Sequence, residues 1–336
     1  MNSASDSGAG PQAKSGRYRN PWPGIKAHGF LDFLRWTIER RRKSRRPDAA
    51  GEALSRMQPA FVLPRADAST LTITWIGHTT TLLQLGGLNV LTDPIWSDRA
   101  SPLAFAGPKR FTPPGVDFDD LPVIDAVVIS HNHYDHLDAR TVSRLIARFP
   151  AAAWRVPLGV ARFVRRKGAS DIEECGWYAT TQVGPLRFTA VPAQHFSGRS
   201  LFDRNATLWC GWVLSSKHHS VYFAGDTALN PSFSEIGERC GPFDAALMPI
   251  GAYDPRWLMR SVHMDPEECV AAVRSLAPGV TDTPLVLATH WGTFQLTDEP
   301  IGEPPRLTRS AWQGASLPSD KLWIARFGET RVVRQL

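Results

Sequence analysis

Residues 124–138 place a dense group of metal-binding side chains directly after a buried strand. The apolar run over residues 124–129 is rich in β-branched side chains, which predicts a buried strand. The loop after it carries four side chains that can bind a metal ion, His131, His133, Asp135 and His136. Imidazole nitrogen and carboxylate oxygen together suit zinc, with iron and manganese as alternatives. A polar loop that is histidine-rich by chance is the weaker interpretation, because so much hydrogen-bonding capacity rarely clusters without a ligand.

The HxHxDH pattern of this loop resembles the signature of the metallo-β-lactamase superfamily. A closer resemblance is to the N-acylphosphatidylethanolamine-hydrolysing phospholipase D family, and its blocks keep their order over residues 17–330. The blocks are Trp75 to His78, Leu91 to Pro94, Gly107 to Phe111, Ser130 to Asp138, Phe223 to Thr227, Pro249 to Tyr253 and Thr289 to Phe294. The resemblance implies an α/β fold, an αββα sandwich of two mixed β-sheets flanked by helices, with the site at the strand ends between the sheets.

Two zinc ions need about seven protein ligands, and the first loop supplies only part of that set. Three further candidates each follow a predicted strand, namely His195, Asp226 and His290. The resemblance implies that one zinc is held by His131, His133, His195 and Asp226, and the other by Asp135, His136, His290 and the same Asp226. Asp226 would bridge the two ions because a carboxylate has two oxygens.

The expected chemistry follows from two cations sharing one water molecule. They lower its pKa from about 15.7 toward about 7, so metal-bound hydroxide is available at neutral pH to attack phosphorus. We expect Asp135 both to bind metal and to orient this hydroxide. The resemblance places a site histidine that contacts the substrate phosphate at His263; the alternative is a histidine of a surface loop. His78 and Asp93 are expected to hold the ligand histidines in place through hydrogen bonds.

Five residues between Asp226 and His263 are candidates for substrate binding. Tyr253, Trp257 and Met259 lie in family-like loops and are predicted to wall an apolar groove that leads to the metals, although such residues are equally common in protein cores. Arg256 and Arg260 are predicted to position a phosphodiester group.

The chain divides into three predicted segments. Residues 1–20 are rich in Ser, Gly, Ala and basic residues without periodicity, which predicts a disordered leader. Residues 21–66 form an N-terminal extension with a short amphipathic helix and the basic run 40–46. This helix either anchors the protein to anionic lipid or docks on the domain. Residues 67–336 form the metallo-β-lactamase-fold hydrolase domain.

Several element predictions can be compared with the structure. Residues 71–76, 79–85 and 88–91 predict strands of an antiparallel sheet with one face buried. Residues 157–167 predict a helix. Asp138 and Asp265 are predicted to cap the starts of two further helices.

Composition limits the class of partner and the location. The formal net charge of +6 favours acidic partners such as phospholipid headgroups. Nucleic acid is not expected, because aromatic residues are not interleaved with basic ones in a stripe. The 4 cysteines are widely spaced, which predicts buried free thiols. With neither a bilayer-spanning run nor an apolar signal segment, we expect a cytoplasmic protein, peripheral on the inner face of the membrane. A homodimer is left open.

The sequence therefore predicts a dinuclear zinc phosphodiesterase of the phospholipase D type, which hydrolyses N-acylphosphatidylethanolamine to an N-acylethanolamine and phosphatidic acid. A nuclease, another phosphodiesterase or a lactonase of the same superfamily is the enzymatic alternative, because one metal core serves many substrates. A lipid-binding regulatory module is the alternative without catalysis, and the complete ligand set argues against it.

Overall fold

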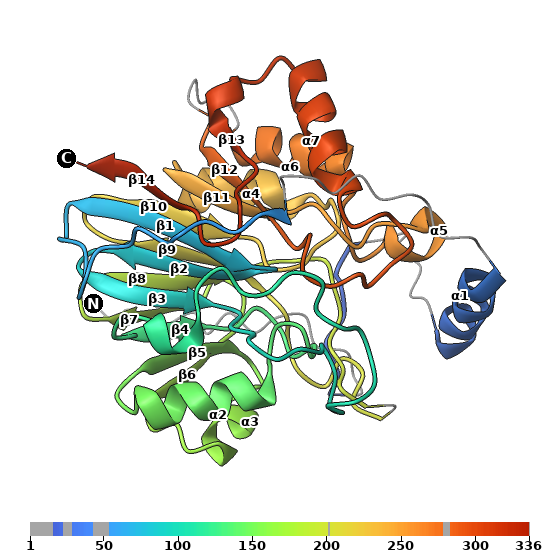
Figure 1. Ribbon diagram of the computed structural model, residues 1–336, viewed down its shortest axis with the longest axis horizontal. Coiled ribbons are helices and arrows are strands. Elements are labelled where there is room, and N and C mark those ends of the chain that lie inside the picture. Colours follow the sequence, from blue (N-terminus) through green and yellow to red (C-terminus); the bar gives the residue numbers. More distant parts are fainter. Residues whose placement is uncertain (1–15, 23–28, 43–53, 201, 278–282, 336) are drawn as a thin grey trace, which may run out of the picture.

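The computed structural model describes residues 16–22, 29–42, 54–200, 202–277 and 283–335. Two seven-stranded sheets lie between two layers of helices. Helices α2 (Ala139–Arg148) and α3 (Ala161–Arg166) cover one side, and α4 (Ser232–Cys240), α6 (Pro266–Leu276) and α7 (Glu303–Gly314) cover the other (Figure 1). This arrangement is the αββα sandwich that the resemblance implied.

The first sheet has the strand order β14-β1-β2-β3-β4-β5-β6. Its strands are β1 (Thr70–Gly77), β2 (Thr80–Leu85), β3 (Leu88–Thr92), β4 (Ala126–Val128), β5 (Ala153–Pro157), β6 (Ile172–Cys175) and β14 (Thr330–Gln335). The strands from β14 to β3 pair antiparallel, as predicted for β1 to β3, and those from β3 to β6 pair parallel. Parallel pairing brings the carboxyl ends of β3 and β4 to one edge of the sheet.

The second sheet has the order β13-β12-β11-β10-β9-β8-β7. Its strands are β7 (Thr180–Val183), β8 (Leu186–Val191), β9 (Gly211–Ser215), β10 (Ser220–Phe223), β11 (Ala245–Pro249), β12 (Leu285–Thr289) and β13 (Leu322–Trp323). Strands β10 to β13 pair parallel, whereas β7 to β10 pair antiparallel. The carboxyl ends of β10 and β12 therefore also share an edge.

The expectation that β1 and β2 bury only one face is wrong, because every residue of both strands is buried. Ile73 and Leu83 pack in the core between the sheets, whereas Leu82 belongs to a second cluster with residues of α2 and the segment before β4. The polar residues that alternate with them pair with each other, since Thr72 Oγ1 donates to Gln84 Oε1 over 2.9 Å. Mutual hydrogen bonding thus replaces solvent on the outer face.

The helix starts were predicted correctly. Asp138 caps α2 by accepting from the backbone N–H groups of Arg140 and Thr141, and Asp265 forms a capping box with Glu268 at α6. The helix predicted over 157–167 is wrong at its start, because residue 157 ends β5 and α3 begins four residues later. A proline can close a parallel strand as readily as it opens a helix.

Residues 16–22 lie against the domain, although residues 1–20 were predicted to be a disordered leader, and residues 1–15 lie outside the described residues. Tyr18 is buried, and its N–H donates to the carbonyl of Asn205 over 2.9 Å. Asn20 Nδ2 donates to the carbonyl of His195 over 2.9 Å. This segment therefore reaches the candidate site.

The predicted amphipathic helix is α1 (Phe30–Arg42), and it docks on the domain. Trp36 Nε1 donates to Asp298 Oδ1 over 3.0 Å, and Arg40 donates to the carbonyl of Thr297 over 2.9 Å. Arg35 places its guanidinium carbon 5.1 Å from the ring centre of Trp257 in α5 (Arg256–Met259). The basic run is described only as far as residue 42. No helix in the described part of the chain is long and apolar enough to cross a bilayer.

Candidate metal centre

The predicted metal-binding residues follow four strands that end at the same side of the sandwich. Loop 129–138 follows β4, His195 follows β8, Asp226 follows β10 and His290 follows β12. Gly225 lets the loop after β10 approach the first loop closely. Its φ is +66°, and a Cβ atom there would lie 2.7 Å from the Cβ of Ser130. The fold thus brings side chains that are distant in sequence into one centre.

Three histidines form the first cluster of this centre. His131 Nε2 lies 2.7 Å from His133 Nδ1, and His195 Nε2 lies 3.2 Å from the same atom. Burial lowers the pKa of His133 to about 3 and that of His195 to about 4. The two rings are therefore neutral at physiological pH and keep the lone pair that a metal ion takes.

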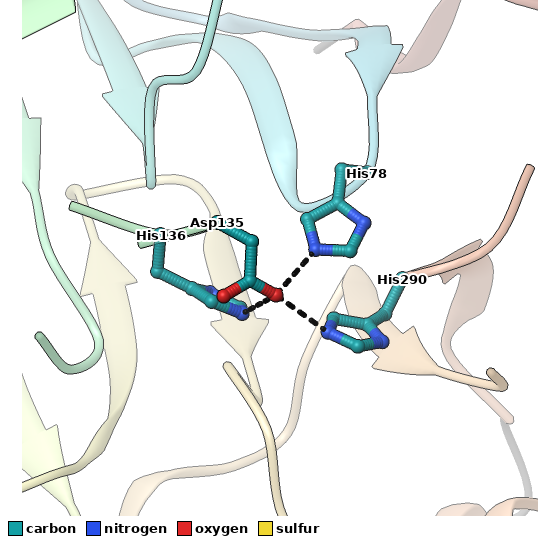
Figure 2. Close-up of side chains that lie close together, drawn as sticks. All are labelled: His78, Asp135, His136 and His290. Atoms are coloured by element: carbon teal, nitrogen blue, oxygen red, sulfur yellow. Dashed lines mark hydrogen bonds and ion pairs between the residues drawn. The ribbon is translucent and has the colours of Figure 1, made fainter. Parts of the chain in front are cut away.

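The carboxylate of Asp135 is surrounded by three imidazoles in the second cluster (Figure 2). Its Oδ2 lies 3.0 Å from His78 Nε2, 3.3 Å from His136 Nε2 and 3.5 Å from His290 Nε2. The potential ligand atoms of all four residues lie within 4.8 Å of one another. His78, predicted only as a support, therefore stands as close to Asp135 as the predicted ligands do.

Asp226 lies between the two clusters. Its Oδ2 is 3.1 Å from Nε2 of both His136 and His290, and 3.8 Å and 3.9 Å from Nε2 of His195 and His131. Its Oδ1 is buried and has no hydrogen-bond partner among the described residues. One carboxylate thus faces histidines of both clusters, as expected for a bridging ligand.

The donor set fits a metal centre. Among the described residues, His136 Nε2 and both ring nitrogens of His290 are buried without a hydrogen-bond partner. Buried polar atoms in folded proteins are nearly always paired. Although burial opposes it, Asp226 and Asp135 raise the pKa of His136, and they raise that of His290 to about 9. The two carboxylates thus stabilise positive charge at the place where a cation would lie.

Asp93 and Ser130 hold the ligand rings from behind. Asp93 Oδ2 accepts from His136 Nδ1 over 2.7 Å and from Ser130 Oγ over 2.5 Å. The carbonyl of Val262 lies 2.9 Å from His195 Nδ1. These contacts leave Nε2 of His136 and of His195 directed toward Asp226. Asp93 was predicted from the sequence, whereas a backbone carbonyl carries no sequence signal.

Arg199, which the sequence analysis did not single out, holds loop 129–138. Its Nη1 donates to the carbonyls of Asn132 over 2.7 Å and Leu137 over 2.8 Å. Its guanidinium carbon lies 4.0 Å from the ring centre of Tyr134, and the Tyr134 hydroxyl donates to the Arg199 carbonyl over 2.7 Å. In the sequence, only its position four residues after His195 could have pointed to Arg199.

His263 lies beside both clusters. Its ring centre is 5.0 Å from that of His195 and 5.3 Å from that of His290. Its side chain is half-buried, and Nδ1 is buried with no partner among the described residues. Burial holds the pKa of His263 well below its usual value. The alternative of a surface-loop histidine does not match this placement.

A pocket of about 430 Å³ opens onto the centre. Five polar side chains of the centre line the pocket, and we call them its floor: His133, Asp135, His195, Asp226 and His263. Apolar side chains form its walls, namely Trp22, Phe33, Trp36, Phe196, Leu258, Met259, Val262 and Leu296. Helix α1 and residues 19–22 thus contribute to the pocket, which sequence patterns did not predict.

Two of the three predicted groove residues lie outside this pocket. Met259 lines it, as predicted. Tyr253 instead directs its hydroxyl to Glu303 Oε1 over 2.8 Å, and Trp257 packs beneath the guanidinium of Arg35. The short helix α5 turns only one side toward the metals, so residues adjacent in sequence face different surroundings.

Arg256 and Arg260, which were predicted to position a phosphodiester, both pair with carboxylates and do not line the pocket. Arg256 pairs with Asp265 over 3.3 Å and with Glu268 over 2.5 Å, and Arg260 pairs with Glu268 over 3.3 Å. The acidic start of α6 thus neutralises both guanidinium groups. Arg256 Nη1 also donates to the carbonyl of His263 over 3.0 Å, so it supports the loop that carries this histidine.

Comparison with known proteins agrees with this geometry. The profile of the beta-lactamase superfamily domain matches residues 88–291. An uncharacterized protein of Mycobacterium tuberculosis is 45% identical over 278 residues, which cover 82% of this chain and 71% of that protein. N-acyl-phosphatidylethanolamine-hydrolyzing phospholipase D 1 of Caenorhabditis elegans is 41% identical over 238 residues, which cover 68% of this chain and 65% of that protein. The solved metallo hydrolase Igni18 of Ignicoccus hospitalis has a TM-score of 0.58 at 23% identity and covers 78% of this chain and 97% of its own.

Fold, centre and comparisons together define a metal-dependent hydrolase. The chain belongs to the metallo-β-lactamase superfamily, and its homologues include an N-acyl-phosphatidylethanolamine-hydrolyzing phospholipase D.

Proposed function

We propose that the protein is a dinuclear zinc phosphodiesterase of the phospholipase D type, which hydrolyses N-acylphosphatidylethanolamine to an N-acylethanolamine and phosphatidic acid. The observation that carries the proposal is the apolar pocket that ends at two clusters of metal-binding side chains, with Asp226 facing histidines of both. The nematode relative carries this activity in its name and is 41% identical. Iron or manganese is the alternative to zinc for the same donor set.

Each cluster would hold one metal ion. One ion would lie among His131, His133, His195 and Asp226, and the other among Asp135, His136, His290 and Asp226. When bound, the pair supplies Lewis acidity toward the phosphoryl oxygens and lowers the pKa of water. Asp135 is placed to orient the attacking water, because its carboxylate lies on the pocket floor. His263 is placed on the same floor to donate a hydrogen bond to the phosphoryl group or the departing alcohol oxygen.

The pocket walls suit an acylated substrate. Trp22, Phe33, Trp36 and Phe196 line the same cavity as the metal clusters, so an acyl chain would remove apolar surface from water on binding. A polynucleotide needs a continuous basic groove instead. The lining therefore favours the lipid over the nuclease alternative.

An apolar surface next to the pocket supports contact with a membrane. On α1, Leu31 is 77% exposed and the pocket-lining Phe33 is 53% exposed, and Phe202, two residues before the pocket-lining Arg204, is 84% exposed. Exposed apolar side chains beside a ligand pocket suit contact with lipid, and the positive net charge favours anionic lipid. We therefore place the pocket mouth against the bilayer, with the protein peripheral to the membrane.

Vesicle co-sedimentation tests this orientation. Binding to vesicles of phosphatidylcholine with phosphatidylglycerol is expected to fall about tenfold in a variant that combines Leu31→Ser and Phe202→Ser. Val332 is also apolar and 61% exposed but lies in β14, so Val332→Ser is the matched control. Equal loss in both variants would contradict the orientation.

The catalytic proposal is tested with a substrate panel. Metal-loaded protein and Asp135→Asn are given N-acylphosphatidylethanolamine, bis-p-nitrophenyl phosphate, single-stranded RNA and a lactone, and products are identified by mass spectrometry. Metal-dependent release of N-acylethanolamine that is lost in the variant is expected. Cleavage of only RNA or only the lactone would overturn the lipid assignment, and metal analysis of the purified protein identifies the ion.

A further inference from the structure

Two arginines line the pocket in addition to its apolar walls, and both differ from the arginines predicted from the sequence. They are Arg19 and Arg204. Arg256 and Arg260 are neutralised by carboxylates of α6, whereas no carboxylate among the described residues pairs with Arg19 or Arg204. An arginine without an acidic partner that lines a ligand pocket is available to bind an anion.

The guanidinium of Arg204 is seated close to the first metal cluster. Its carbon lies 4.7 Å from the ring centre of Phe196. The Phe196 ring in turn lies 4.5 Å from the ring of His133 and 4.9 Å from that of His195. The cation and two predicted metal ligands therefore contact the same aromatic ring, and stacking on this ring restricts where the cation can lie.

Neighbouring residues fix the backbone that carries Arg204. Arg17 donates from its guanidinium to the carbonyl of Phe202 over 2.9 Å and to that of Arg204 over 2.7 Å. The adjacent carboxylate of Asp203 accepts from the N–H groups of Arg199 over 2.9 Å and Ser200 over 2.7 Å. Asp203 is therefore used by its own loop and leaves Arg204 without a counter-charge.

The guanidinium of Arg204, which has no carboxylate partner among the described residues, favours a substrate with an additional anionic group. An N-acylated phosphatidylethanolamine has lost the amine charge and carries a single anionic group, the phosphodiester. The metal centre would take that group, which leaves Arg204 without an anion to bind. A substrate with a second anion near the phosphodiester would satisfy both sites at once.

We propose that Arg204, assisted by Arg19, binds a carboxylate on the headgroup of the substrate, so that the enzyme prefers N-acylated phosphodiester lipids of the phosphatidylserine type to those of the phosphatidylethanolamine type. This inference rests on the proposed function, because it assigns the headgroup of the same lipid substrate. Arg204 acts as a specificity residue and takes no part in bond cleavage.

Binding without turnover tests the inference first. N-dodecanoylserine and N-dodecanoylethanolamine differ by one carboxylate, and their affinities for the metal-loaded full-length protein are measured by calorimetry. The wild type is expected to bind the serine compound about fivefold more tightly, and Arg204→Gln to bind both within twofold. Arg204→Lys keeps the charge and should retain part of the preference. Arg309→Gln, an exposed arginine on α7, is the matched control and should retain all of it.

An equal preference in Arg204→Gln and wild type would overturn the inference, because the carboxylate would then bind elsewhere, for example at the metals. Absence of any preference in the wild type would overturn it as well.

Turnover of the two parent lipids separates this inference from the proposed function. The ratio of kcat/KM for N-acylphosphatidylserine over N-acylphosphatidylethanolamine should fall about fivefold in Arg204→Gln and stay within twofold of the wild-type ratio in Arg309→Gln. If neither lipid is hydrolysed although the binding preference depends on Arg204, the proposed reaction fails and the carboxylate site stands. If both lipids are hydrolysed with the same ratio in all variants, the reaction stands and the carboxylate site fails.

Discussion

Asp93 Oδ2 lies 2.7 Å from His136 Nδ1, and both side chains are fully buried. This contact fixes the proton on Nδ1 and leaves Nε2 of His136 free to face Asp226 at 3.1 Å. A residue that touches no substrate thus determines which nitrogen of a ligand is available. The same logic applies to His195, whose Nδ1 lies 2.9 Å from the carbonyl of Val262.

Replacing this carboxylate is expected to weaken metal binding. Asp93→Asn removes the negative acceptor from His136 and should lower the affinity of the second cluster for zinc by about 10- to 100-fold. Competition with a chromophoric chelator measures the affinity. Asp120→Asn, a change outside the centre, is the control and should leave it unchanged. Unaltered affinity in Asp93→Asn would show that His136 does not depend on Asp93.

Metal stoichiometry should separate the shared carboxylate from ligands of one cluster. Asp226 faces histidines of both clusters, so Asp226→Ala is expected to retain less than about 0.2 metal ion per chain. His290→Ala removes a ligand of the second cluster alone and should retain about one. Elemental analysis by mass spectrometry after dialysis gives both numbers. Full loss in His290→Ala and partial loss in Asp226→Ala would reverse the assignment.

Metal removal should also affect stability. The buried polar atoms without partners at His136, His290 and Asp226 cost free energy in the metal-free fold. Chelation is therefore expected to lower Tm by about 10 °C, and added zinc to restore it. Differential scanning calorimetry with and without chelator measures the shift. An unchanged Tm would mean that the centre does not bind metal in the folded protein.

The fold and the clustering of the predicted ligand residues could be predicted from sequence for a physical reason. Ligands of a compact centre leave the ends of buried strands, and both features produce strong local patterns, as at residues 124–138. The other predicted ligands follow predicted strands in the same manner, namely His195, Asp226 and His290.

The pocket could not be predicted in this way, because its walls depend on packing between distant segments. Trp36 lines it only because α1 docks on Asp298, and nothing in the local pattern of α1 specifies that partner. Arg256 was assigned to the substrate because it is basic and lies beside family-like loop residues, whereas its pairing with Asp265 and Glu268 is visible only in three dimensions. The sequence gives the charge of an arginine, but whether that charge can bind a substrate depends on which carboxylates lie beside it in the folded protein.

The four cysteines are free, and three of them are buried. Burial raises the pKa of Cys175 to about 11 and that of Cys269 to about 12, and it raises those of Cys210 and Cys240 too. At pH 8 only about one thiol in a thousand of Cys175 is ionised, and the thiolate fraction rises about tenfold per pH unit below the pKa. Reaction with Ellman's reagent should therefore be slow and confined to the half-buried Cys240. Fast reaction of two or more thiols in native protein would contradict the packing.

Docking of α1 should affect lipid turnover more than general catalysis. Trp36 is 4% exposed, lines the pocket and donates to Asp298. Trp36→Ala is expected to raise KM for the lipid substrate about tenfold while kcat/KM for bis-p-nitrophenyl phosphate stays within twofold. Thr37→Ala on the same helix is the control. Equal loss on both substrates would mean that Trp36 supports the centre itself.

Arg256 is expected to act through His263 and not on the substrate. It donates to the His263 carbonyl over 3.0 Å, while Glu268 and Asp265 neutralise its charge. Arg256→Ala should lower kcat about tenfold with little change in KM or metal content, because the His263 loop loses its support. Arg260→Ala removes a neighbouring partner of Glu268 and should leave kcat within twofold. If Arg256→Ala raised KM and left kcat unchanged, the guanidinium would contact substrate directly, and the assignment made from sequence would stand.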